Sequence, residues 1–269
     1  MNVTRIISIV LLLASLALGY YLVVSVKTEI ETKEMITERE RAVIEHLKFI
    51  REAESVYLEV NGNYTSDWDK LINFIKNGRY PIIQRKERVV TLSYGADSSI
   101  ITFDTLGIIS AKERIFKATH NINAANDGLF VQYMVNTGAD VKQGNKAYVL
   151  NQNNKLVTHK FRKGGVVVRQ ESKAEGQQVS KGDLLMTLEE TKFDPNFNID
   201  RIAYVPGYDD VKFEIYAAEV DKSGALVDVI EVYNPKPFDP TRRDDADAKN
   251  KKPLRFGSRT DITTAGNWE

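Results

Sequence analysis

The most hydrophobic stretch of the chain runs from Ile6 to Val26 and contains no charged residue. Its length of about 21 residues is close to the roughly 20 that an α-helix needs to cross a bilayer. Arg5 precedes the run and Lys27 follows it, and tyrosines stand near its end, where interfacial aromatic residues are common. This pattern predicts a transmembrane anchor. A cleaved signal peptide with small residues at 17–19 is the alternative, but a signal core usually has only ~7–15 apolar residues.

The charges beside this run bear on its orientation. Basic residues on its exit side are Lys27, Lys33, Arg39 and Arg41, against Arg5 in the head 1–5. That count alone would keep the following chain in the cytoplasm, but long domains translocate largely regardless of flanking charge. A short head before one basic residue is also typical of a signal anchor. We therefore expect a single-pass protein of the bacterial inner membrane, with residues 1–5 cytoplasmic, 6–26 spanning and the bulk in the periplasm.

Apolar residues continue beyond the anchor at helical spacing. They recur every seven positions at Ile36, Val43, Ile50 and Tyr57. This spacing predicts an amphipathic stalk helix that continues the membrane helix. Its apolar stripe either packs on the chain's own domain or forms a coiled-coil seam for self-association; polar Arg39 and His46 at the alternate heptad positions favour the first. Asn61-Gly62 ends the helix, and a second short helix over 67–76 completes segment 27–80.

The remaining pattern is that of β structure. Between 81 and 120 short apolar runs alternate with turn residues, which predicts antiparallel strands with a turn at 95–98. Within 191–238, Val211–Val220 and Ala225–Tyr233 alternate apolar with polar residues and predict a β-hairpin. Segment 239–269 is rich in charge and reads as a polar linker and tail. Trp268 in that tail either docks on the chain or contacts a partner. The expected class is α+β, mostly β.

A short pattern occurs twice, in Gly128–Leu150 and again in Gly165–Leu188. In each copy a glycine is followed three residues later by a valine, and then by the block G-x-x-V-x-x-G. The block glycines are Gly138, Gly144, Gly176 and Gly182, and the valines of the two copies are Val131, Val141, Val168 and Val179. We expect the block glycines to adopt the positive φ angles of tight turns. The four valines should form the core of one module over 121–190, because two such halves bury their apolar faces together. Residues 121–127 would be its polar entry linker.

This arrangement resembles the biotinyl/lipoyl (barrel-sandwich hybrid) domain, a flattened barrel of two pseudo-symmetric halves that also occurs in periplasmic membrane fusion proteins. The resemblance covers residues 128–188. In lipoyl carriers the modified lysine sits on the turn between the halves, which the resemblance places at Asn151–Lys155 here. Lys155 is then the matching position and the cofactor-binding candidate if it is modified, although its neighbours Asn154 and Leu156 depart from the family's flanks. Asn153, Asn154 and Lys155 would also form an exposed tip for partner contact.

Two further resemblances concern the ends of the chain. The anchor, the stalk helix and a short helix with Trp68 and Leu71 resemble the N-terminal region of type IV pilins and pseudopilins. The Phe and Glu of the prepilin cleavage motif are missing from the apolar run, so processing and polymerisation are not expected. The ending Gly-Asn-Trp-Glu at 266–269 resembles single-pass envelope proteins of Bacteroidota-type bacteria, a likeness that implies no function.

Composition excludes several function classes. The 37 basic and 37 acidic residues cancel, so no overall charge favours nucleic acid, and the absence of Cys excludes thiolate chemistry. The three His share no metal-ligand spacing. We expect no catalytic residues, no metal and no cofactor, and not an enzyme. The leading hypothesis is an envelope scaffold or assembly protein that contacts other envelope proteins in a secretion, transport or surface-assembly machine. A membrane-fusion-type adaptor and a carrier modified at Lys155 are the alternatives.

Overall fold

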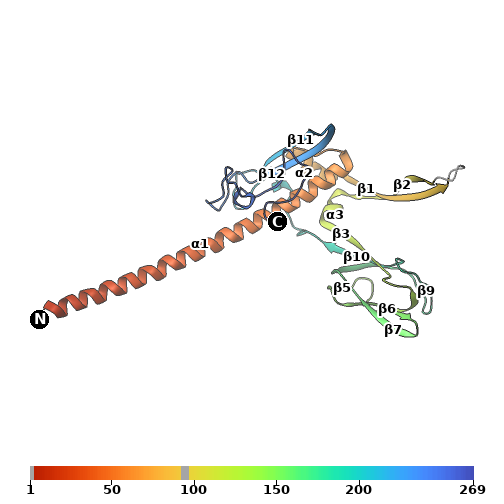
Figure 1. Ribbon diagram of the computed structural model, residues 1–269, viewed down its shortest axis with the longest axis horizontal. Coiled ribbons are helices and arrows are strands. Elements are labelled where there is room, and N and C mark those ends of the chain that lie inside the picture. The colour runs from red at the N-terminus through yellow and green to blue at the C-terminus, as the bar shows by residue number, and fades with distance from the viewer. Residues whose placement is uncertain (1–2, 92–96) are drawn as a thin grey trace. The chain divides into compact units, whose positions relative to one another are not determined.

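The computed structural model describes the backbone of residues 3–91 and 97–269 (Figure 1). The first two residues of the expected head 1–5, and residues 95–96 of the expected turn at 95–98, lie outside this range. The class is α+β and mostly β, as the sequence predicts, with a long apolar helix followed by mostly antiparallel sheets. The chain forms two compact units. The first contains residues 1–55, 61–68 and 200–269, and the second contains residues 56–60 and 69–199.

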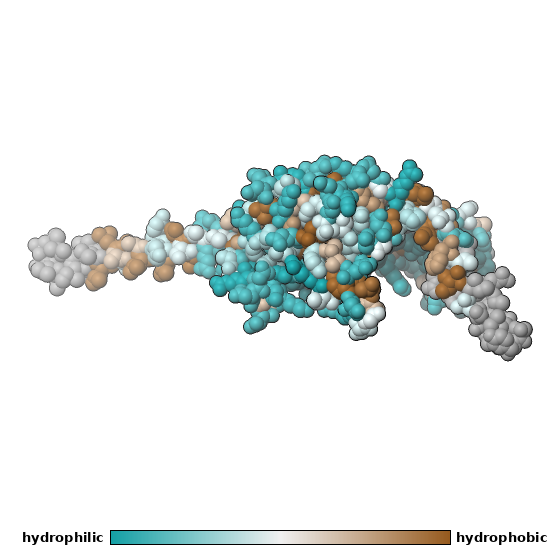
Figure 2. Space-filling view, turned by 90° about the horizontal axis from the view of Figure 1, so that it is seen from above, coloured by the Kyte–Doolittle hydropathy of each residue, from teal (hydrophilic) through white to brown (hydrophobic). Residues whose placement is uncertain are grey.

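Helix α1 spans Val3–Asn61. Among the described residues it is the one helix long and apolar enough to cross a membrane, and none of its most apolar window is buried inside the structure. Figure 2 shows hydrophobic residues along the N-terminal part of this helix. Such a helix supports membrane association, since a bilayer would cover apolar side chains that the protein leaves exposed. Gly62, at φ +81°, follows its last residue as the sequence predicts for a C-terminal cap.

The apolar stripe of the stalk is used within the chain. Val43, Leu47, Ile50 and Ala53 are fully buried. The Nε2 atom of His46 lies 2.9 Å from the carbonyl oxygen of Ile202, which ties the helix to the C-terminal part of the first unit. Of the two predictions for the stripe, packing on its own unit is therefore the one that the structure shows. From 43 to 53 these positions are unavailable for a coiled-coil seam.

The first unit also contains a small antiparallel sheet, in the order β11-β12-β13. Its elements are β11 (Glu214–Lys222), β12 (Ala225–Tyr233), β13 (Arg255–Gly257) and the short 3₁₀ helices η1 (Ile199–Arg201) and η2 (Lys249–Lys251). The expected hairpin is present, with Ser223 and Gly224 in its turn. The expected polar linker and tail are not a linker throughout, because β13 pairs with β12 and buries Leu254 and Phe256. These two apolar residues supply the core contact that a linker lacks.

The second unit opens with two helices and a long hairpin. Its elements are α2 (Trp68–Asn77), β1 (Arg79–Thr91), β2 (Asp97–Ser110) and α3 (Ala111–Phe116). The expected short strands are thus two long ones, paired from Arg79–Ser110 to Thr91–Asp97. Helix α3 was not predicted. Ser110 is its N-cap: the side chain of Ser110 accepts a hydrogen bond from the backbone N–H of Glu113 at 3.1 Å.

The rest of the second unit is a module of two four-stranded antiparallel sheets, residues 117–191, which we call the sandwich module. One sheet has the order β3-β10-β8-β5, from β3 (Lys117–Asn123), β5 (Asp140–Val141), β8 (Gly165–Gln170) and β10 (Leu184–Thr191). The other has the order β7-β6-β4-β9, from β4 (Gly128–Tyr133), β6 (Lys146–Gln152), β7 (Lys155–Lys160) and β9 (Gln178–Val179).

The two halves of the module follow one plan. The first half is β3 to β6 and the second is β7 to β10, and each strand takes the same place in its sheet as its counterpart. The repeat therefore begins one strand earlier in each half than the glycine pattern indicates. The expectation of a polar linker over 121–127 is wrong for its first part, because β3 extends to Asn123 and pairs with β10. Ile122 packs against the module core there.

Candidate functional site

The core of the sandwich module is built around the two block valines. Val141 and Val179 are buried and belong to one apolar cluster between the two sheets. Each lies in a two-residue strand opposite the first glycine of a repeat: Val141 pairs with Gly165, and Val179 pairs with Gly128. Each block valine is therefore held at the edge of a sheet by main-chain pairing with the glycine that opens the other half.

The other two predicted core valines need correction. Val168 is 44% exposed and Val131 is half-buried, whereas Phe130 and Val167 are buried in the cluster. Successive side chains in a strand point to opposite faces. The position two residues after the first glycine therefore faces the core, and the position three residues after it does not. The repeat is genuine, but its inward position is one residue earlier than predicted.

Backbone approach explains why both repeats begin with glycine. A Cβ atom at Gly165 would lie 2.7 Å from the carbonyl oxygen of Glu189, and one at Gly128 would lie 2.9 Å from that of Asn151. Real Cβ atoms essentially never come this close to backbone oxygens. Gly165 also has φ +142°, a conformation that residues with a side chain rarely adopt.

We expect Gly165→Ala to lower the free energy of unfolding by about 2–3 kcal/mol, from backbone strain and from the clash with Glu189. Urea unfolding of the full chain in detergent, followed by far-ultraviolet circular dichroism, measures the change. Gly107→Ala is the matched control, because a Cβ at Gly107 in β2 meets no atom within 4 Å. Equal midpoints for the two variants would contradict this account of the repeat.

The block glycines form turns that tie one half of the module to the other. Gly138, Gly144, Gly176 and Gly182 all have positive φ angles, between +79° and +96°. The N–H of Gly138 donates to the carbonyl of Val167 at 2.7 Å, and the N–H of Gly176 donates to that of Phe130 at 2.8 Å. These equivalent bonds each cross between halves, so the turns help to fix the sandwich as well as reverse the chain.

The junction between the halves is a two-residue hairpin turn. Asn153 and Asn154 occupy it, with φ of +52° and +62°, as in the tight turns that favour asparagine. Lys155 follows the turn as the first residue of β7, where it pairs with Gln152. The resemblance assigned the modified lysine to the turn itself. Here both turn positions hold Asn, and Lys155 is exposed one residue beyond them.

A basic groove borders the open edges of β3 and β7 and was not anticipated from the sequence. It has a volume of about 930 Å³. Its basic side chains are His120, His159, Lys160, Arg162, Lys163 and Lys181. The His120 Nε2 atom lies 2.9 Å from the Glu190 carboxylate, and the Lys163 Nζ atom lies 3.5 Å from His120 Nδ1. His159 stacks on Tyr148 with ring centroids 4.7 Å apart, and burial lowers its pKa.

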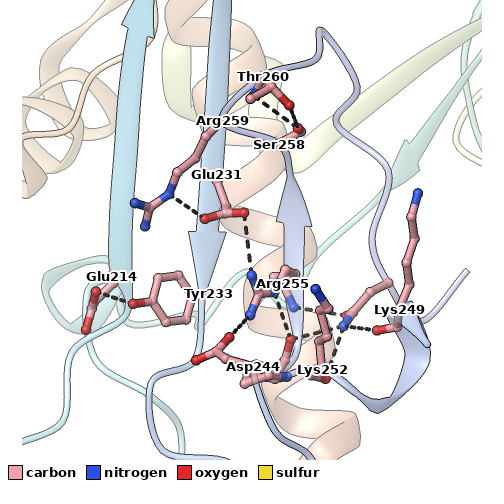
Figure 3. A network of polar contacts seen from close by, with 12 residues as sticks. Glu214, Glu231, Tyr233, Asp244, Lys249, Lys252, Arg255, Ser258, Arg259 and Thr260 are labelled. Carbon is pink, nitrogen blue, oxygen red and sulfur yellow. Dashed lines mark hydrogen bonds and ion pairs between the residues drawn. The ribbon is translucent and has the colours of Figure 1, made fainter. Parts of the chain in front are cut away.

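The C-terminal segment of the first unit is held by a polar network (Figure 3). Glu231 is at its centre: it accepts a hydrogen bond from Arg259 Nε at 2.8 Å and lies 3.6 Å from the guanidinium of Arg255. Arg255 in β13 also forms an ion pair with Asp244. Asn267 donates to the carbonyls of three residues of the same segment, at 3.0–3.2 Å: Lys249, Lys252 and Pro253. The network accounts for the order of a charged segment that sequence alone marks as a linker.

Trp268 docks on its own unit. Its ring lies 6.0 Å from the Arg51 guanidinium, and Glu269 accepts a hydrogen bond from the same Arg51 at 2.6 Å. The indole Nε1 atom of Trp268 is buried, with no acceptor among the described residues. Of the two predicted roles, docking is the one that the structure shows. The partner-contact role assigned to Trp268 would have to use the part of its ring that remains accessible.

The histidines and acidic residues of the described chain can be compared with the requirements of a catalytic or metal site. No group of three or more His, Asp or Glu residues there could hold a metal ion. His46 is buried against Phe213, and this burial lowers its pKa to about 4, so the imidazole is neutral near pH 7. The His120 Nε2 atom and the Glu190 carboxylate form a pair at 2.9 Å. The module offers strand edges, a hairpin tip and a basic groove, which are features of binding.

Comparison with known proteins adds a partial likeness. No family model matches the chain, and no curated protein matches it. Among solved structures, the chain is similar to one described as a single-chain, multi-domain long-chain acyl-CoA carboxylase, with 24% identity and a TM-score of 0.26. The similarity covers 30% of this chain and 8% of that one. A likeness so partial bears on neither fold nor function. The fold and the site themselves define the class: a protein with one candidate membrane-spanning helix and a mostly β body that contains a two-fold sandwich module.

Proposed function

We propose that this protein is a non-enzymatic scaffold or assembly protein of the bacterial envelope, anchored in the inner membrane by α1 with its bulk in the periplasm. Its sandwich module makes protein contacts in a secretion, transport or surface-assembly machine. The observation that carries the proposal is the junction turn. Asn153 and Asn154 fill the tip where a carrier domain would present its lysine, while the two-fold sandwich around that tip is kept.

The same turn weighs against the two alternatives. In membrane-fusion adaptors, the family resemblance implies a long helical hairpin inserted between the half-motifs. Here β6 ends at Gln152 and β7 begins at Lys155, so nothing is inserted. A carrier would need Lys155 to reach a modifying enzyme from the turn, and Lys155 instead pairs within the hairpin ladder. A scaffold requires neither feature, since it binds through strand edges and loop tips.

One labelling experiment tests both placement and role. The chain has no Cys, so Lys155→Cys introduces a single exposed thiol at the hairpin tip. We expect a membrane-impermeant maleimide that bears a photo-crosslinker to label this thiol in spheroplasts, and illumination to join the protein to other envelope proteins. Mass spectrometry identifies what is joined.

Val179→Cys provides the control, because its thiol is buried and should react only after denaturation. Labelling of Lys155→Cys only in lysed cells would refute the periplasmic placement. Crosslinks restricted to abundant bystanders, at this position and at other exposed positions of the module, would refute the scaffold role.

A further inference from the structure

The basic groove of the sandwich module follows a strand edge rather than a sheet face. Seven consecutive residues, from Thr119 to Ala125, line it on the β3 side, and Thr158 to Lys160 line it on the β7 side. Alternate residues of a strand point to opposite faces, so a hollow bordered by consecutive residues must run along the backbone edge. The groove thus exposes main-chain N–H and C=O groups of β3.

Apart from the carbonyl of Asn123, which accepts a hydrogen bond from the Tyr148 hydroxyl at 3.4 Å, the outward main-chain groups of β3 are available for pairing within the described part of the chain. In the described part of the chain, β3 pairs with β10 alone and β7 pairs with β6 alone, so each is the outer strand of its sheet. An outer strand of about seven residues is a template onto which another extended segment can add by main-chain hydrogen bonds. At roughly 3.3 Å per residue this edge extends about 23 Å.

Exposed basic side chains line the groove. Lys160, Arg162, Lys163 and Lys181 are all exposed. Among the described residues, none of these four side chains forms an ion pair with a carboxylate. Two acidic groups lie beside these four cations: Glu190 is against His120, and Asp127 accepts from the backbone N–H of Lys181 at 2.6 Å. The groove therefore has a surplus of cations that a bound anionic segment would balance.

We propose that this groove binds an acidic, extended segment of a partner protein, which adds as a strand to the free edge of β3. The main-chain pairing gives register, while carboxylates of the segment contact the four cations that line the groove. Alternate side chains of the segment would lie beside Ile122, which is partly buried and also lines the groove. The inference rests on the proposed scaffold function and specifies the surface and the chemistry of its partner.

An octapeptide of alternating Glu and Val tests the proposal, with the full chain in neutral detergent and binding followed by fluorescence anisotropy. We expect binding that weakens as salt is raised. The double variant Lys160→Glu with Arg162→Glu should weaken it by about tenfold or more, because two attractions become repulsions. Both positions are exposed, and an unchanged unfolding midpoint verifies that the variant folds.

Two matched controls make the test specific. Lys155→Glu reverses a charge at the opposite end of β7, five residues from Lys160 and so roughly 17 Å away, and should leave binding within about twofold. An octapeptide with two Glu at each end and four consecutive Pro in the middle keeps the charge but lacks central main-chain donors on both of its edges, and should bind at least about tenfold more weakly. Equal binding of the Pro peptide would overturn strand addition. Equal or tighter binding of an oligothymidylate of the same charge would overturn the assignment to a peptide.

A parallel crosslinking experiment separates this inference from the proposed function. Asn121→Cys places the photo-crosslinker in the groove, whereas Lys155→Cys places it at the hairpin tip. Specific partners joined from Asn121 support the inference. Specific partners joined from Lys155 with none from Asn121 would overturn the inference while leaving the scaffold role in place. The absence of specific partners from both would overturn both.

Discussion

The free energy of unfolding should be level between about pH 4.5 and 6.5 and should then fall by about 2 kcal/mol as the pH rises to 8. The cause is Glu54, a buried carboxyl in the stalk helix. Its Oε2 atom accepts a hydrogen bond from the backbone N–H of Thr65 at 3.1 Å, and its Oε1 atom has no partner among the described residues. Burial raises its pKa from 4.5 to about 8.

The direction follows from proton counts. Between 4.5 and about 8 the folded state keeps a proton on Glu54 that the unfolded state releases, so stability falls as pH rises. His46 acts in the opposite direction: burial lowers its pKa from 6.5 to about 4, so the unfolded state binds the extra proton there and stability rises with pH. The two slopes oppose each other up to about pH 6.5. Above pH 6.5 only Glu54 still binds different numbers of protons in the folded and unfolded states. A slope of about 1.4 kcal/mol per pH unit over about 1.5 units gives the expected fall in stability.

Glu54→Gln isolates this effect. The amide keeps the acceptor for the Thr65 N–H but does not titrate, so stability should rise up to about pH 6.5 and then remain constant. Urea unfolding of the full chain in detergent at pH 5, 6.5 and 8, followed by tryptophan fluorescence, measures both profiles. A wild-type chain whose stability is unchanged between pH 6.5 and 8 would show that Glu54 is ionised in the folded state.

Removal of Arg242 should destabilise the first unit by about 3 kcal/mol. Its guanidinium contacts both oxygens of Glu40 on α1, at 2.5 and 3.0 Å, and donates to the carbonyls of Asn250 and Lys252 at 2.8 and 3.0 Å. The two side chains are only 14% and 16% exposed. Arg242→Ala would leave Glu40 partly buried and unpaired by its main partner, which costs more than the ion pair itself contributes.

The same substitution should release the segment around η2. Trypsin should cut at Lys249–Lys252 faster in Arg242→Ala than in wild type, because two of the hydrogen bonds that hold this segment are lost. Arg243→Ala is the matched control: the residue is adjacent and exposed, and its backbone bond to Lys251 is retained. Its unfolding free energy should change by less than about 0.5 kcal/mol. Similar cleavage rates for both variants would mean that Arg242 does not hold the segment.

Local sequence determined several features of this protein. The uncharged run 6–26 specifies a helix suited to a membrane, because length and apolarity are local properties. The positive φ angles of Gly138, Gly144, Gly176 and Gly182 follow from turn chemistry, which is also local. The repeat itself located Val141 and Val179 in one core, since two copies of the same half-motif bury equivalent residues in the interior that they share.

The repeat did not reveal which valines face the core or which strands complete each half of the module. Val168 was assigned to the core because it recurs in the pattern, yet strand geometry turns Val167 inward instead. The first strands of the two halves, β3 and β7, share no glycine-valine signature, so the sequence pattern does not reveal that they belong to the repeat. They nevertheless occupy equivalent places, each as the outer strand at the same end of its sheet.

The tertiary structure alone decided which distant groups meet. Glu40 and Arg242 are 202 positions apart, and no periodicity of either segment pairs them. The sequence likewise marks Glu54 as one more acid on a charged helix, and only packing reveals that it is buried. The basic groove combines β3, β7 and the loop that holds Lys181, which become neighbours when the two halves close. Local pattern fixes backbone conformation, whereas burial and charge pairing depend on contacts made across the fold.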